Sequence, residues 1–191
     1  MKGIATLLAA GLALAAMSAP PARAQDVPKI DLFAGYTYVH GNAVVSGQGI
    51  SLNGGSASVD YNWNDWLGLA ADFGSYVQGS VAGQGKTLNV TTYLFGPRLS
   101  WRKLDRFTPF GQALLGSGHA GGTLYTSGAN PLGTQNSFAM TAGGGVDWNA
   151  NRRVAVRLFQ SEYLRTQFHN GVNTNQNSLR LSFGVVFHFG K

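Results

Sequence analysis

The chain has 191 residues, of which 27 are glycine, 12% are aromatic and only 12% are charged. An average soluble domain carries about 25% charged residues, so this composition excludes an ordinary soluble enzyme. Hydrophobic residues reach 44%, but beyond the N-terminal segment no apolar run has the roughly 20 residues that a membrane-spanning helix needs. A helical membrane protein is therefore excluded as well, and the length corresponds to one domain.

The first 24 residues have the layout of a secretory signal peptide. Lys2 supplies the positive charge, residues 4–17 form a short apolar segment, and Ala22-Arg23-Ala24 is a small-x-small cleavage site. We expect cleavage after Ala24, export from the cytoplasm and a short lead over 25–29. The mature chain has no basic run of the kind that binds nucleic acid, so no nucleic-acid partner is expected. The absence of cysteine excludes disulfides and thiolate metal sites.

The rest of the chain shows the period of two that is typical of β-strands. The last segment is the clearest, because Leu179, Leu181, Phe183, Val185, Phe187 and Phe189 alternate with small or polar residues. Successive side chains of a strand point to opposite faces, so each such segment has one apolar face. In chain order, the alternation predicts eight strands, over residues 30–40, 54–62, 66–76, 89–102, 107–118, 137–148, 154–165 and 178–189.

The polar faces of these segments carry Gly, Ser, Ala and a few isolated charges. A soluble sandwich, which is the alternative, would expose Lys, Glu and Thr there. Small residues suit the crowded interior of a narrow barrel, whose apolar face contacts lipid. In hydrocarbon every backbone polar group needs an internal partner, so the sheet must close. We therefore predict an all-β fold, an eight-stranded antiparallel up-and-down transmembrane β-barrel over residues 30–191.

The connections between the predicted strands alternate in length. Residues 62–65, 103–106 and 149–152 are tight polar turns, as is usual on the periplasmic side of outer-membrane barrels. The other connections are long, rich in Gly, Asn, Ser and Gln, and predicted to be surface loops that offer sites for a ligand; they span residues 41–53, 77–88, 119–136 and 166–177.

Residues 30–190 resemble the small eight-stranded outer-membrane barrels, namely the OmpA-type transmembrane domain and the OmpX and opacity relatives. The resemblance rests on residues 32–38, 61–68 and 143–147, and above all on the end of the chain. There, the final-strand assembly signal polar-x-Gly-x-x-aromatic-x-aromatic is matched by Ser182, Gly184, Phe187 and Phe189.

This resemblance implies a location in the bacterial outer membrane. It also implies contact with outer-membrane lipid and lipopolysaccharide, and recognition of the last strand by the outer-membrane assembly machinery. Two departures are that Gly190 and Lys191 follow the last aromatic residue, and that a C-terminal peptidoglycan-binding domain is not expected.

Six charged residues share the polar parity of their strands, and we predict that they form a polar network in the lumen. An Arg facing lipid at the midplane costs about 2–4 kcal/mol, and a buried ion needs a partner. The network has two interpretations, a structural plug or a gated narrow pore. The six residues are Asp60, Asp72, Arg98, Asp147, Arg157 and Arg180.

In two places the alternation does not decide which side chains point into the barrel and which point outward. Strict alternation places Glu162 on the lipid face, so that either a bulge near Phe159 switches the parity or Glu162 lies at the outer interface. In residues 107–118 neither parity is cleanly polar.

Barrel enzymes that modify lipid A use His, Ser and a carboxylate near the outer rim, and Glu162, His169 and Ser178 lie near the last long loop. Their spacing matches no lipase nucleophile elbow, and no serine follows His169 directly. His40, His119 and His169 lack metal-ligand spacing, so no metal, cofactor or catalytic site is expected. We expect a non-enzymatic scaffold whose four loops contact partners. The alternatives are a narrow pore or transporter for small or apolar solutes and, third, a lipid A-modifying enzyme. The surface ligand and the oligomeric state stay open.

Overall fold

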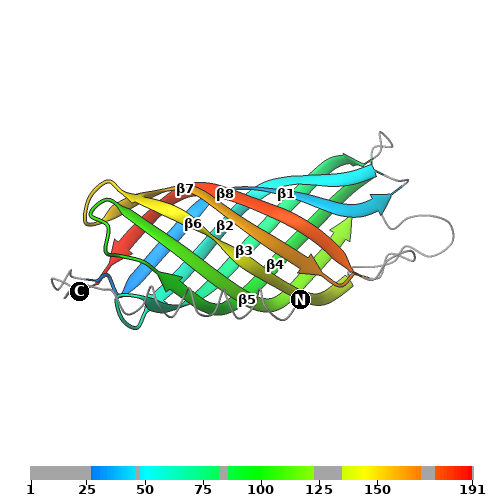
Figure 1. Cartoon of the computed structure of the whole chain (residues 1–191). Helices are drawn as coiled ribbons and strands as arrows, with labels where there is room; N and C mark the ends of the chain where they lie inside the picture. The colour runs from blue at the N-terminus through cyan, green and yellow to red at the C-terminus, as the bar shows by residue number, and fades with distance from the viewer. Residues whose placement is uncertain (1–26, 46–47, 82–85, 123–134, 169–174, 191) are drawn as a thin grey trace, which may run out of the picture.

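The computed structural model describes residues 27–45, 48–81, 86–122, 135–168 and 175–190. The predicted signal peptide and its cleavage site lie outside these residues. Within the described part, eight antiparallel strands follow one another around a closed barrel, and the first strand pairs with the last (Figure 1). This confirms the predicted fold. The strands are β1 (Ile30–Val45), β2 (Gln48–Asn62), β3 (Leu67–Val81), β4 (Lys86–Ser100), β5 (Phe107–Gly122), β6 (Gln135–Asn149), β7 (Val154–Thr166) and β8 (Gln176–Phe189).

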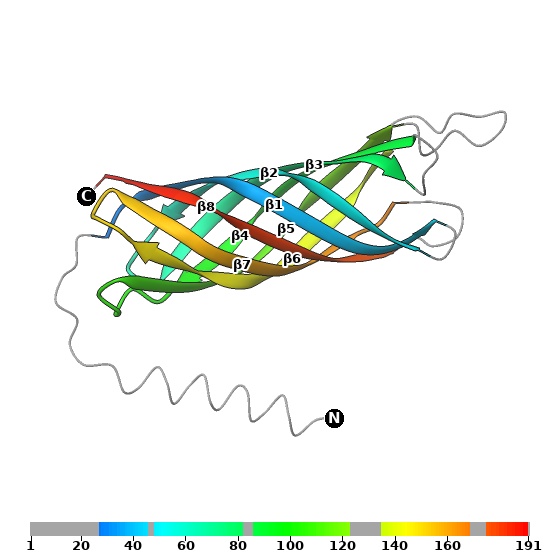
Figure 2. The same ribbon diagram turned by 90° about the horizontal axis from the view of Figure 1, so that it is seen from above.

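The barrel has two unlike ends. The start of β1, the end of β8 and the three short connections 63–66, 101–106 and 150–153 lie at one end, which we call the short-turn end (Figures 1 and 2). The ends of β1, β3, β5 and β7 and the starts of β2, β4, β6 and β8 lie at the opposite end, which we call the long-loop end. Among the described residues, no helix is long and apolar enough to cross a membrane.

The predicted bounds of the long loops were wrong. Segments 41–53 and 77–88 are in large part strand, because β1 continues to Val45, β2 begins at Gln48, β3 continues to Val81 and β4 begins at Lys86. Strand also enters the other two segments at both ends, since β5 continues to Gly122 and β6 begins at Gln135, and β7 ends at Thr166 and β8 begins at Gln176. Their Gly, Asn, Ser and Gln residues are typical of loops. In a closed barrel, however, the neighbouring strand supplies partners for every backbone group, and pairing therefore continues where the hydrophobic alternation stops. At the other end β4 stops at Ser100, two residues before its predicted end.

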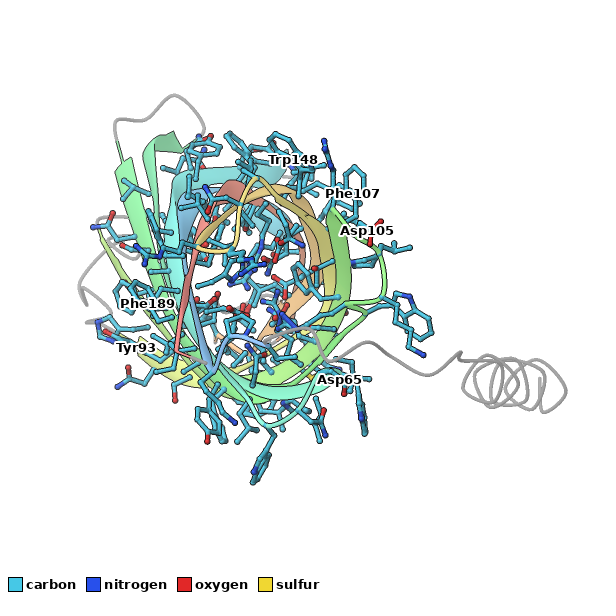
Figure 3. The ribbon with its side chains drawn as sticks, turned by 90° about the vertical axis from the view of Figure 1, so that its left-hand side faces the viewer. Asp65, Tyr93, Asp105, Phe107, Trp148 and Phe189 are labelled. Carbon is cyan, nitrogen blue, oxygen red and sulfur yellow. The ribbon has the colours of Figure 1, made fainter. Side chains whose placement is uncertain are left out.

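The outer wall is apolar from the middle of the barrel to the short-turn end. Leu181 and Phe183 of β8 are 39% and 56% exposed, and Tyr93, Phe107, Trp148 and Phe189 point away from the barrel in Figure 3. Between larger side chains, a depression of about 750 Å³ lies over small residues such as Ala34, Ala57 and Ala71. Such a surface fits acyl chains and not water.

A β-bulge in β7 decides the facing of Glu162. Leu158 and Phe159 both point outward, with 49% and 54% exposure. The register against β8 shifts between Arg157 and Gln160. The parity therefore switches, and Glu162 points inward with 1% exposure. Of the two alternatives, the bulge is correct.

The facing of β5 is also clear. Phe110, Gln112 and Leu114 point inward and are buried, whereas Leu115 is 57% exposed on the outer wall. The sequence pattern was ambiguous because two large apolar residues, Phe110 and Leu114, occupy the interior face.

Candidate functional site: the filled interior

The structure brings the six predicted network residues into the interior, where all are at most 5% exposed. Four of them form one cluster nearer the short-turn end. Arg98 Nη1 lies 2.7 Å from Asp60 Oδ2, and its Nη2 lies 3.1 Å from Asp147 Oδ2. Arg157 donates from Nε to Asp147 Oδ1 at 2.7 Å. Asp147 therefore bridges two guanidiniums that come from β4 and β7.

Aromatic rings complete this cluster. The Arg98 guanidinium lies 3.7 Å from the ring centre of Phe110, and that of Arg157 lies 4.2 Å from the ring centre of Phe33. A guanidinium over an aromatic face is stabilised by the ring quadrupole. The two inward phenylalanines therefore fill space between the charges and also hold the arginines in place.

A second cluster is centred on Arg180. Its Nη1 donates to Asp72 Oδ1 at 2.6 Å, and its Nε donates to Glu162 Oε2 at 2.7 Å. Gln112 Nε2 donates to the other oxygen, Glu162 Oε1, at 2.9 Å. Tyr76, which has no exposed surface, accepts from Arg180 Nη1 at 3.1 Å. One arginine from β8 thus holds carboxylates from β3 and β7 together across the barrel.

A third group closes the short-turn end, and the sequence analysis did not single it out. Asp31 Oδ2 accepts from Asn62 Nδ2 at 2.8 Å and from Arg102 Nη2 at 3.1 Å, and Asp31 Oδ1 lies 2.7 Å from His188 Nδ1. Asp31 and His188 face each other where β1 meets β8. Burial lowers the pKa of Arg102, and the Asp31 carboxylate opposes this shift. The inward parity of Asp31 and His188 was the available sequence signal.

Towards the long-loop end the interior becomes apolar. These side chains continue the inward parity of the charged residues, are at most 8% exposed and belong to one packed cluster with Tyr76. Tyr76 therefore marks the boundary between a charged and an apolar half of the interior. The cluster includes Val39, Ile50, Leu52, Leu88, Val90, Leu114, Leu164 and Phe168.

The outward face in this apolar half carries many polar side chains, together with a few exposed apolar ones such as Val77 and Leu179. Tyr38 Oη lies 2.9 Å from Ser51 Oγ, and His119 Nδ1 lies 2.7 Å from Asn136 Oδ1. Tyr163 donates to Asn177 Oδ1 at 2.6 Å. These pairs link neighbouring strands from outside, as water-facing side chains do on a soluble sheet. In this half, therefore, the packed apolar side chains lie inside and most of the outward hydrogen-bonding pairs are polar, as in a water-soluble domain.

Of the residues considered for catalysis or metal binding, the structure describes Glu162, Ser178, His40 and His119. Glu162 is deep in the interior, where it forms an ion pair with Arg180 of β8. Ser178 lies two residues before Arg180 on the same strand. His169 lies outside the described residues. His40 is on the outer face, with Nδ1 3.0 Å from Ser51 Oγ. Among the residues that the structure describes, no group of three or more His, Asp or Glu is placed to hold a metal ion.

The four residues of the predicted assembly signal occupy both faces of β8. Ser182 is buried, and its Oγ lies 2.8 Å from Thr37 Oγ1. Gly184 lies against β1, where a Cβ would collide with the backbone of Ala34. Phe187 and Phe189 point outward with 44% and 49% exposure. Recognition of this strand by the assembly machinery stays a prediction.

The comparisons with known proteins agree with this architecture. A family model described as outer membrane protein beta-barrel domain matches residues 8–189. Neisserial surface protein A is 18% identical, with a TM-score of 0.63 over 84% of this chain and 97% of that one. OprG from Pseudomonas aeruginosa is 10% identical, with a TM-score of 0.57 over 87% and 98%. Ail of Yersinia pestis is 14% identical, with a TM-score of 0.55 over 84% and 99%. No curated protein sequence matches the chain. At these identities the solved structures share the fold alone.

Proposed function

The chain belongs to the outer membrane protein β-barrel domain family and resides in the bacterial outer membrane, and from this premise we propose that it is a non-enzymatic scaffold that presents its long loops to partners outside the cell. The observation that carries the proposal is the filled interior. Charged clusters occupy the half near the short-turn end, and a packed apolar cluster occupies the other half. The fold therefore offers a rigid support and no passage.

The alternative of a narrow pore would require both halves to open. An ion on this path would have to separate Arg180 from Asp72 and Glu162, whose paired atoms lie 2.5–2.6 Å apart. It would then have to cross a segment lined by apolar side chains such as Leu114 and Leu164. Eight strands enclose an interior just wide enough for side chains to fill, so neither half leaves room for rearrangement.

The composition of the loop segments indicates the kind of partner. Residues 41–53, 77–88, 119–136 and 166–177 contain one lysine, Lys86, and no Arg, Asp or Glu. Ail has been solved in complex with the heparin analogue sucrose octasulfate, and a polyanion of that kind needs cations that these segments lack. We propose instead a neutral polar partner, such as an uncharged glycan, bound through amide, hydroxyl and aromatic groups.

Binding assays on immobilised carbohydrates test this proposal. The folded full chain in detergent is applied to heparin beads and to an array of neutral glycans, together with a variant in which residues 123–134 are replaced by a Gly-Ser segment of equal length. We expect no heparin retention at physiological salt, and neutral-glycan binding that the variant loses. Heparin retention that salt abolishes would contradict a neutral partner. Equal array binding by both proteins would contradict binding through this segment.

The absence of enzymatic activity is part of the same proposal. Both oxygens of Glu162 accept hydrogen bonds, from Gln112 and Arg180, in the middle of the interior. A carboxylate held this way is out of reach of a lipid substrate outside the barrel. Mass spectra of lipid A from cells with and without the protein check this, and a changed acyl pattern would contradict it.

A further inference from the structure

Two short turns at the same end of the barrel share one backbone design. Each follows an Asn-x-Asn sequence, at residues 62–64 and 149–151. Asn64 Oδ1 accepts from the backbone N–H groups of Trp66 and Leu67 at 3.0 and 2.7 Å. Asn151 Oδ1 accepts from the equivalent groups of the other turn, those of Arg153 and Val154, at 2.8 and 2.9 Å.

The side chains carried by this shared backbone have opposite character. The first turn places Asp65 and Trp66 after its asparagine, and the second places Arg152 and Arg153 at the same two positions. All four are exposed. The turn 63–66 makes the same hydrogen bonds without arginine, so Arg152 and Arg153 are not needed to form the turn 150–153. Their exposed charges can therefore bind a partner.

The arginine turn is joined by a second basic turn. The backbone N–H of Asn149 donates to the carbonyl of Arg106 at 2.8 Å, which places turn 150–153 beside turn 101–106. Arg102 also lies in turn 101–106, but its side chain points inward to Asp31 and adds no positive charge to the exposed surface. The exposed charged side chains of these two turns are four cations and one carboxylate, Asp105. We call the four cations the basic rim: Lys103, Arg106, Arg152 and Arg153.

Aromatic side chains set the level of the basic rim in the membrane. Phe107 and Trp148 face each other across β5 and β6, are 42% and 37% exposed, and point outward side by side in Figure 3. Trp101 lies under the ammonium of Lys103, which is 5.0 Å from its ring centre. Trp residues gather where the bilayer meets water. The charges beyond these rings therefore lie at the level of the lipid headgroups.

We propose that the basic rim binds the phosphate headgroups of anionic phospholipids, of the phosphatidylglycerol class, in the periplasmic leaflet. Short turns of outer-membrane barrels face the periplasm, and the location of the chain in that membrane supplies the phospholipid. A guanidinium binds phosphate oxygens through two parallel hydrogen bonds. Clustered Lys and Arg at a bilayer surface attract anionic lipid. The turn 63–66 carries the acidic side chain of Asp65 beside one exposed cation, Lys29, whose carbonyl accepts from the backbone N–H of Asn62, so this turn has no surplus of positive charge.

Spin-labelled lipids test the proposal directly. The mature barrel is reconstituted in phosphatidylcholine vesicles with a trace of spin-labelled phosphatidylglycerol or spin-labelled phosphatidylcholine, and the motionally restricted fraction of each label is measured. We expect an about threefold preference for phosphatidylglycerol, weakened in 0.5 M salt. The variant R106Q/R152Q/R153Q should lose it. The matched control D65N, a charge removal on the equivalent turn, should keep it. A gel shift between boiled and unboiled samples verifies folding.

Two single substitutions keep the test decisive if the triple variant does not fold. Arg152→Asp installs the residue that the equivalent turn carries at that position, and should reduce the preference. Asp65→Arg should increase it. No preference in the wild type, or an unchanged preference in the arginine variants, would overturn the proposal. A second outcome would also overturn the proposal. In it, the wild type cosediments with purified peptidoglycan, the arginine variants do not, and the lipid preference of all of them is the same. The basic rim would then bind the cell wall and not phospholipid.

Discussion

The two halves of the barrel differ in which face of their strands carries most of the apolar side chains. In β2, Val59 is half-exposed on the outer wall and Asp60 is buried inside, whereas further along the same strand Leu52 is buried and Asn53 is exposed. The pairing of β2 with β3 runs from Asn53 to Asn62 without a register shift. The change is therefore not caused by a bulge. We infer that the medium outside changes from hydrocarbon to water at this point, and that the surroundings, not the strand, decide which face is apolar.

The largest expected effect lies in the charged half. Arg180→Met leaves Asp72 and Glu162 buried without their cation, and removing one partner of a buried ion pair costs about 3–5 kcal/mol. We expect a loss of this size in the free energy of unfolding, measured by urea titration in lipid vesicles. Arg152→Gln, on an exposed turn, is the control and should change it by less than about 0.5 kcal/mol. Equal losses in both variants would show that Arg180 is not held by ion pairs.

The apolar half should respond to lost volume. Leu114 is fully buried in the interior, and Leu→Ala at such sites costs about 2–5 kcal/mol, partly because a cavity remains. The adjacent Leu115, 57% exposed on the outer wall, is the matched control, since lipid can fill the space that Leu115→Ala leaves. We expect the loss in unfolding free energy for Leu114→Ala to be at least twice that for Leu115→Ala. The reverse order would place Leu114 outside.

The smallest of the three effects tests the outer faces. Val59→Asn puts an amide against hydrocarbon and should cost about 1–3 kcal/mol. Asn89→Val, on the outward face of the other half, should change the free energy by no more than about 0.5 kcal/mol. Urea titrations of both variants in the same vesicles check this. If Asn89→Val were strongly stabilising, that half would contact lipid, and the comparison between the halves would fail.

The sequence predicted most of the charged half because its alternation is strong. Six inward charges stood out against an apolar outer face. The apolar half was missed for a physical reason. There the apolar parity is inverted, so that Ile50 and Leu52 appear as scattered residues among Gly, Asn and Ser and suggest a loop. The facing of Glu162 stayed open because alternation alone cannot decide whether the bulge that it allows near Phe159 is present. The similarity of the two Asn-x-Asn sequences can be read from the chain, but the hydrogen bonds that the two turns share could not be predicted from it.

Single-channel recording in planar bilayers tests most directly the claim that both halves fill the interior. The folded wild-type chain is predicted to add no discrete conductance steps in 1 M KCl, because no ion passes both the charged clusters and the apolar cluster. Discrete, ion-selective openings of the wild type that disappear in Arg98→Ala would contradict the account, since they would show ions passing through the charged clusters.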